Sequence, residues 1–232
     1  MKMGYKITRS NINNYTWFRT AKCATTTILS QLVKHTQITE DTSYPFVQHH
    51  SGDKSLNSLS KKYIDSVKKL DIKMYDVKCD NQFKFSFVRN PYERLYSCWW
   101  SKFGRHNSYD KLTCTYGVEQ YISHGDEAMS FESFVKNVIA NCDVSDDKTN
   151  VHYASLVSLF PREELDFVGR VENLQQDFGV VCDKIGIPKQ QLPHKNKHKH
   201  GHYTEYYDDE TRGIVAQKYA KDIEYFGYKF GD

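Results

Sequence analysis

The apolar residues of this chain recur with two periods, one typical of strands and the other of helices. Residues 15–20, YTWFRT, carry three aromatic side chains and predict a buried strand. From Thr25 to about Lys34 the apolar positions follow helical spacing. Residues 36–58 are polar and predict a loop, and residues 60–70 fit a second helix with its apolar residues on one side.

A second strand–turn–helix unit is indicated further along. Residues 84–89, KFSFVR, alternate in the manner of a strand. Asn90 is a favourable N-cap, Pro91 suits the first helical position, and Glu93 stands where a capping-box acid belongs. The sequence therefore predicts that a helix begins directly after this strand.

The remainder of the pattern continues the alternation. Residues 131–141 fit a helix, and 165–174 fit a strand with a short turn that leads into a helix ending at Ile185. Residues 187–203 form a basic loop, and 208–226 fit a final amphipathic helix.

Strands that alternate with helices predict an α/β fold with a central parallel sheet flanked by helices on both faces. The length suits one domain over residues 1–232. In such a sheet, ligands bind beyond the carboxyl ends of the strands. We therefore look for functional residues where the predicted strands end.

Composition narrows the class of protein. The net charge of +3 mildly favours anionic ligands, and it is lower than the charge of a nucleic-acid-binding tail. No apolar run approaches the roughly 18–20 residues needed to cross a bilayer, and the N-terminus lacks a signal-peptide pattern. The six cysteines are scattered without a C-x-x-C pair, so we expect reduced thiols in a cytoplasmic protein and no structural zinc.

The first candidate anion site follows the strand at 15–20. The stretch TAKCATTTI places Lys22 and three threonines, Thr25–Thr27, between that strand and the next helix. A helix N-terminus offers unpaired N–H groups and the positive end of a dipole, and Lys22 adds a point charge. The alternative is a threonine-capped helix beside a surface lysine. The G-x-x-x-x-G-K-[ST] motif of nucleotide triphosphatases is absent.

The second candidate anion site follows the strand at 84–89. Arg89 ends that strand, and Ser97 lies two turns into the following helix, so the two side chains could meet one phosphate. The alternatives are a salt bridge for Arg89 and a packing role for Ser97. Glu93 and Arg94 are assigned structural roles, as a cap and as a surface or ion-pair residue. Two separate anion sites suggest a nucleotide that carries phosphates at both the 3′ and 5′ positions.

These motifs resemble a known family. RTAKCATTTI and FVRNPYERLYS together are similar to the sulfotransferases that use 3′-phosphoadenosine 5′-phosphosulfate (PAPS), in particular the carbohydrate sulfotransferase type. DFVGRVENLQQDF (166–178) and the stretch 192–230 also resemble that family, so the resemblance runs from about residue 16 to 230. Ala21 and Ala24 depart from the proline and glycine that are usual in the first motif.

The resemblance implies a fold similar to the P-loop nucleotide-binding fold, and it implies roles for particular residues. The first motif would hold the 5′-phosphosulfate, Arg89 and Ser97 the 3′-phosphate, and the basic loop would cover the nucleotide. The residues expected to bind PAPS are Lys22, Cys23, Ala24, Thr25, Thr26, Thr27, Arg89, Ser97, Lys197 and Lys199.

For catalysis, Lys22 is expected to stabilise the leaving phosphate oxygen, and no metal is required. The general base would be His50, with neighbouring His49 as the alternative, because histidine titrates near neutral pH. His152 and Tyr153 could meet the acceptor or simply pack. The acceptor is expected to be a hydroxyl group, most plausibly of a sugar.

Two other functions stay open at this point. A nucleotide-dependent kinase would bind ATP and transfer a phosphoryl group. A non-catalytic nucleotide- or polyanion-binding module would bind PAP, the desulfated product, without turning over PAPS.

Overall fold

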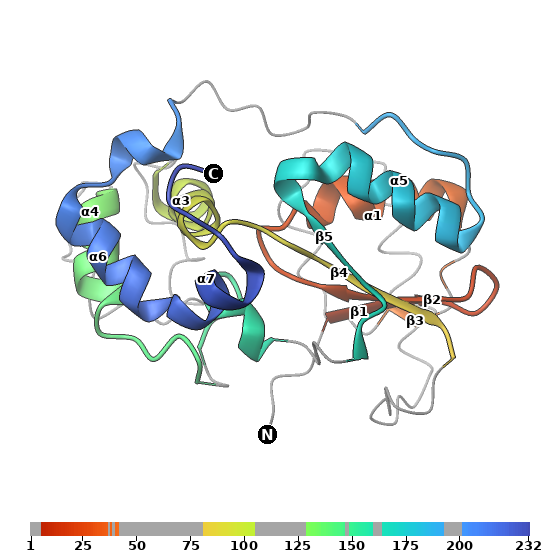
Figure 1. The fold of residues 1–232 in the computed structure, drawn as a ribbon, viewed down its shortest axis with the longest axis horizontal. Helices are drawn as coiled ribbons and strands as arrows, with labels where there is room; N and C mark the ends of the chain where they lie inside the picture. The colour runs from red at the N-terminus through yellow and green to blue at the C-terminus, as the bar shows by residue number, and fades with distance from the viewer. Residues whose placement is uncertain are drawn as a thin grey trace. The chain divides into compact units, whose positions relative to one another are not determined.

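The structure is a computed structural model that describes residues 6–36, 38, 40–41, 81–104, 129–146, 149–159, 164–192 and 201–232. Its contacts divide the chain into two compact units, and each is described by itself. The sheet unit holds the β-strands with helices α1 and α5 and the short 3₁₀-helix η9 (Val171–Asn173), and the helical unit holds the other helices (Figure 1). None of the helices in these ranges is long and apolar enough to cross a membrane.

The sheet unit confirms the predicted α/β class. Its five strands lie in the order β3-β1-β2-β4-β5, and β2, β4 and β5 are parallel, as predicted. β1 and β3 are antiparallel additions at one edge, and the sequence analysis did not predict either of them. The strands are β1 (Lys6–Ser10), β2 (Tyr15–Arg19), β3 (Glu40–Asp41), β4 (Phe83–Val88) and β5 (Phe167–Arg170).

Aromatic packing sets the register of the parallel strands. Trp17 pairs with Phe85 across β2 and β4, and their rings stack with centroids 6.1 Å apart. On β5, Gly169 lies opposite Phe87, and a Cβ added to Gly169 would fall 2.4 Å from the Phe87 ring. This glycine is therefore required by close approach of a buried ring, because a side chain there would displace Phe87.

Helices α1 (Thr25–His35) and α5 (Leu174–Ile185) flank the sheet, and Figure 1 shows both on the same side of the strands. Each follows a strand, as the sequence pattern predicts. The Tyr15 hydroxyl lies 3.0 Å from the Thr36 hydroxyl, which joins the start of β2 to the end of α1. The sheet thus fixes where α1 begins, at the carboxyl end of β2.

The helical unit differs from the predicted pattern at two places. Where a helix over 131–141 was expected, residues 131–133 form one α-helical turn that continues as a π-helix to Ile139. The expected helix over 208–226 divides at Tyr219, whose buried hydroxyl donates to the carbonyl of Tyr153. The elements are α3 (Pro91–Trp99), η3 (Trp100–Gly104), α4 (Phe131–Ser133), η6 (Phe134–Ile139), η7 (Leu156–Ser158), η10 (Tyr203–Tyr206), α6 (Asp209–Lys218) and α7 (Ala220–Phe226).

An aromatic cluster forms much of the core of the helical unit. Tyr96 of α3 lies 4.5 Å from Tyr206 of η10, measured between ring centroids. Trp99 is buried, and its indole N–H donates to the carbonyl of Met129. The cluster places η10 against α3, the helix that follows Arg89.

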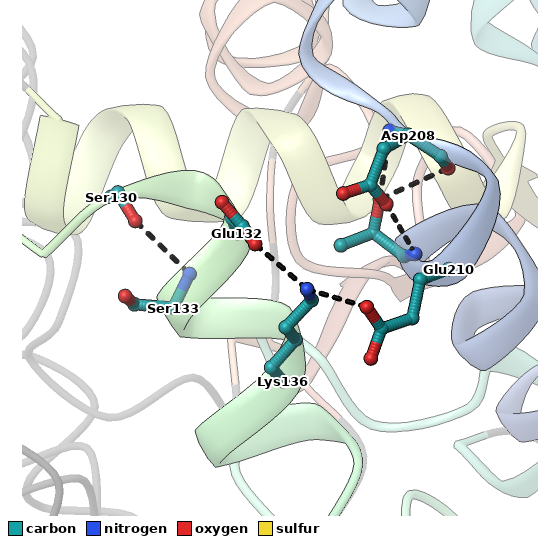
Figure 2. A network of polar contacts seen from close by, with 7 residues as sticks. Ser130, Glu132, Ser133, Lys136, Asp208 and Glu210 are labelled. Carbon is teal, nitrogen blue, oxygen red and sulfur yellow. Dashed lines mark hydrogen bonds and ion pairs between the residues drawn. The ribbon is translucent and has the colours of Figure 1, made fainter.

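A network of charges joins η6 to the start of α6 (Figure 2). Lys136 Nζ lies 2.7 Å from a carboxylate oxygen of Glu132 and 2.6 Å from one of Glu210. Asp208 caps α6, and the backbone N–H of Thr211 that donates to it holds the pKa of Asp208 below its usual value. These contacts lie on the surface, so each contributes little to stability by itself.

Candidate functional site

The loop after β2 has an unusual backbone. Lys22 and Ala24 both have positive φ, at 67° and 56°, while Cys23 between them does not. Alternation of left- and right-handed residues turns successive backbone N–H groups towards one side, which forms a concave anion-binding nest. The sequence FRTAKCATT therefore builds, without glycine, a loop whose main chain can hold a phosphate or sulfate group.

The threonines fix this loop against the sheet. Thr20 donates its hydroxyl to the carbonyl of Phe87 on β4. The Thr25 hydroxyl donates to the carbonyl of Thr20 at 2.7 Å, which closes the loop on itself. Thr27 is buried and Thr26 is exposed, so the three adjacent hydroxyls lie in three different environments. The loop, which joins β2 to α1, is thus also anchored to the neighbouring strand β4.

The N-terminus of α1 suits a bound anion. Its first intrahelical bond runs from Ile28 N–H to the carbonyl of Ala24, so the N–H groups of the preceding turn have no intrahelical acceptor. No side chain caps the helix, and its first turn holds no acidic residue. The half-buried Lys22 precedes it by three residues. Cys23 is buried, with its thiol 3.6 Å from the carbonyl of Ala21, so this residue offers its backbone to a ligand.

Ala24 holds its left-handed conformation at a cost, because its Cβ crowds the following carbonyl. We expect Ala24→Gly to raise the free energy of unfolding by about 0.5–1 kcal/mol. The gain is the strain that glycine relieves, reduced by the conformational entropy that glycine adds to the unfolded chain. Urea unfolding measures this change. Ala216→Gly, inside α6, is the control and should lower stability by about 1 kcal/mol. A loss of stability in Ala24→Gly would contradict the inference that the backbone of Ala24 is strained.

The second candidate site begins where β4 ends. Asn90 caps α3 as predicted, because its side chain accepts the backbone N–H of Tyr92, and Pro91 occupies the first helical position. The Asn90 amide also donates to the carbonyl of Lys229 at 2.7 Å, so the C-terminal residues hold this corner. Arg89 directly precedes this buried cap, and its backbone is therefore well fixed.

Glu93 and Ser97 lie four residues apart on one face of α3, and Arg89 stands two residues before the helix begins. The Arg89 guanidinium contacts the Glu93 carboxylate at 2.5 Å. Glu93 was expected as a capping-box acid, and the structure shows it paired with the arginine. Ser97 is half-buried, two turns into the helix. Both groups expected to hold a 3′-phosphate thus stand four residues from Glu93.

The structure corrects the position expected for Arg94. This side chain is buried and lies away from the surface, where it donates to the carbonyls of Ala154 and Val151 at 2.7 and 3.0 Å. Sequence spacing could not reveal this role, because its partners lie about 60 residues away. The side chain serves the internal framework of the helical unit.

The remaining expected site residues are placed as follows. Lys22 and the threonines belong to the sheet unit, whereas Arg89 and Ser97 begin the helical unit. His49, His50, Lys197 and Lys199 lie outside the described residues. Within the described ranges, no three or more histidine, cysteine or acidic side chains gather as a metal-binding group.

Comparison with known proteins gives the family. The sequence profile described as the sulfotransferase family matches residues 6–229. The chain is 28% identical over 118 residues to carbohydrate sulfotransferase 14 of Danio rerio, with 46% of this chain and 31% of that protein covered. It is 25% identical over 177 residues to carbohydrate sulfotransferase 9 of Homo sapiens, with 70% of this chain and 37% of that protein covered. The matches thus span about a third of those relatives, and no solved structure matches significantly. Because the family profile covers both units and both candidate anion sites, this chain belongs to the sulfotransferase family.

Proposed function

We propose that this protein transfers a sulfuryl group from PAPS to a hydroxyl group of a saccharide, and that residues 1–232 form a single sulfotransferase domain. Membership of the family supports the type of reaction. The relatives described as carbohydrate sulfotransferases support a sugar as the acceptor. The spacing of Arg89 and Ser97, together with the first motif, supports PAPS as the donor.

The loop at Lys22–Ala24 carries the proposal. Lys22 and Ala24, at φ values of 67° and 56° on either side of Cys23, adopt a conformation that residues other than glycine rarely populate, and such strain concentrates at ligand sites. Here this backbone conformation places an anion-binding nest and an uncapped helix N-terminus beside Lys22. This arrangement fits the 5′-phosphosulfate, which is a compact anion with several acceptor oxygens.

The reaction breaks the bond between sulfur and the oxygen of the 5′-phosphate, and it forms a bond between sulfur and the acceptor oxygen. Lys22 and the N–H groups at the start of α1 stabilise the charge that develops on the leaving phosphate oxygen. The acceptor proton passes to a general base, for which His50 is proposed and His49 is the alternative. The reaction as proposed uses these groups and requires no metal.

On the helical unit, Arg89 and Ser97 hold the 3′-phosphate. A guanidinium gives a phosphate two parallel hydrogen bonds, and a serine hydroxyl adds a third donor. Lys197 and Lys199 are proposed to cover the nucleotide with further positive charge. Recognition of the 3′-phosphate distinguishes PAPS from nucleotides that carry phosphate only at the 5′ position.

Calorimetric titration of the full chain with PAP and with ATP tests this proposal. We expect PAP to bind at least about tenfold more tightly than ATP, and Arg89→Ala to weaken PAP binding about 100-fold. Arg212→Ala is the matched control, because Arg212 pairs with Asp209 at the exposed start of α6. Incubation with PAPS and a panel of sugars then measures transfer.

Each contrary result has a distinct meaning. A folded protein that binds no PAP would overturn the proposal and leave the loop before α1 as a structural turn only. Preference for ATP with phosphoryl transfer would indicate a kinase. PAP binding with no transfer to any acceptor would indicate a nucleotide-binding module.

A further inference from the structure

We propose that Glu93 is a positioning residue: its carboxylate holds the Arg89 guanidinium in the orientation that receives the 3′-phosphate. Glu93 thereby strengthens the preference for nucleotides that carry this phosphate. The inference rests on the proposed function, since it assumes that Arg89 binds the 3′-phosphate. It assigns a role to a side chain for which the sequence predicted only helix capping.

The contact is direct and partly shielded from solvent. Arg89 Nη2 donates to Glu93 Oε1 at 2.5 Å, and the two side chains are 20% and 28% exposed. An ion pair at this burial experiences less screening than the exposed pair between Arg212 and Asp209, whose side chains are 50% and 94% exposed. The pair can therefore restrict the arginine side chain, which most surface pairs do poorly.

The backbone around Arg89 explains why such a restraint is useful. The buried Asn90 cap and Pro91 fix the main chain on the C-terminal side of Arg89, and β4 fixes it on the other. The side chain nevertheless has four rotatable bonds and loses about 2 kcal/mol of rotamer entropy when it is immobilised. A partner that orders the guanidinium before the nucleotide arrives removes part of that cost from binding.

Glu93 is well placed to act as this partner. It lies in the first turn of α3, where the positive end of the helix dipole stabilises a carboxylate. Asn90 already accepts the Tyr92 N–H, so the capping of the helix does not depend on Glu93 alone. Its position between Arg89 and Ser97, four residues from each, keeps it close to both proposed phosphate ligands.

The chemistry of the guanidinium allows both contacts. The group presents N–H donors on two edges, so a carboxylate can accept from one edge while a phosphate accepts from the other. The Glu93 carboxylate also repels a phosphate nearby, and this repulsion opposes the gain in affinity that comes from ordering Arg89. We expect the ordering of Arg89 to outweigh the repulsion, because the guanidinium contacts Glu93 directly and neutralises its charge.

Binding measurements on two nucleotides separate these effects. PAP and AMP share the adenosine and the 5′-phosphate, and only PAP carries the 3′-phosphate. Dissociation constants for both are measured for the wild type, Glu93→Ala and Glu93→Gln, at one ionic strength. Glu132→Ala is the matched control, since Glu132 forms the same four-residue acid–base pair with Lys136 elsewhere in the helical unit (Figure 2).

We expect Glu93→Ala to weaken PAP binding about tenfold while AMP binding changes by less than about twofold. Glu93→Gln keeps an oxygen that accepts from the guanidinium, so its PAP affinity should stay within about threefold of the wild type. Glu132→Ala should change neither constant.

Two results would overturn the inference while leaving the proposed function intact. If Glu93→Ala binds PAP as tightly as the wild type or more tightly, Glu93 only competes with the phosphate for Arg89. If it weakens PAP and AMP equally, its role is structural. A wild type that binds PAP no better than AMP would instead overturn the proposed 3′-phosphate site, and the inference with it.

Discussion

Replacing Lys22 by alanine is expected to lower the rate of sulfuryl transfer by about 10³-fold, because loss of one preorganised donor at a developing oxyanion costs this much in other enzymes. The loop should survive the change, since alanine already occupies the equally left-handed position two residues later, at Ala24. The measurement is kcat with PAPS and an acceptor found by screening. The PAP dissociation constant is determined alongside it.

The control for this variant is Lys34→Ala, which removes a lysine from the other end of the same helix. It should leave kcat within about twofold of the wild type, because the last turn of α1 lies far from the N–H groups of the first. If Lys22→Ala retained full activity, the lysine would have no part in sulfuryl transfer. If it weakened PAP binding and raised the KM for PAPS while kcat stayed unchanged, its role would be uniform binding of the phosphate.

Replacing Asp222 by alanine is expected to lower the free energy of unfolding by about 3–5 kcal/mol, which is a large part of the stability of most domains. Asp222 is fully buried in α7. Its carboxylate accepts the Ser155 hydroxyl at 2.6 Å and the backbone N–H groups of Leu156 and Val157 at 2.8 and 3.0 Å. Alanine would leave three buried donors without this acceptor.

Urea denaturation of three variants measures the effect. Asp222→Asn keeps one acceptor oxygen and should lose about half as much stability as Asp222→Ala. Asp209→Ala is the control: its side chain is 94% exposed in an ion pair with Arg212, so its loss should cost less than about 1 kcal/mol. A change below about 1 kcal/mol in Asp222→Ala would show that water or a rearranged turn satisfies these donors.

Local signals were sufficient for the elements that carry the candidate sites. The strand at 15–20 and the helix from Thr25 were predicted and are present, as are the strand and helix on either side of Asn90. These predictions held because each depends on neighbours within four residues: the period of apolar side chains, an N-cap, and a proline at the first helical position.

Contacts between distant parts of the chain explain where the structure differs from the elements predicted from the sequence. β1 was not predicted, since its strand character comes from pairing with β2 in a hairpin whose turn contains no glycine. The division of the last helix at Tyr219 has no local cause such as glycine or proline, and its hydroxyl bonds to a residue 66 positions away. The predicted helix at 60–70 lies outside the described residues, as do the histidines expected to supply the base.

The sequence by itself determined the class of fold and the alternation of strands with helices along the chain. It also determined the two short motifs that point to a doubly phosphorylated nucleotide. These follow from residue type and spacing, which act over a few residues. Only the tertiary structure decided that Ala24 adopts a left-handed backbone, that Glu93 holds Arg89, and that Arg94 and Asp222 are buried. The reason is physical: a strained dihedral angle, an ion pair or a buried charge persists only when contacts from distant parts of the chain offset its cost.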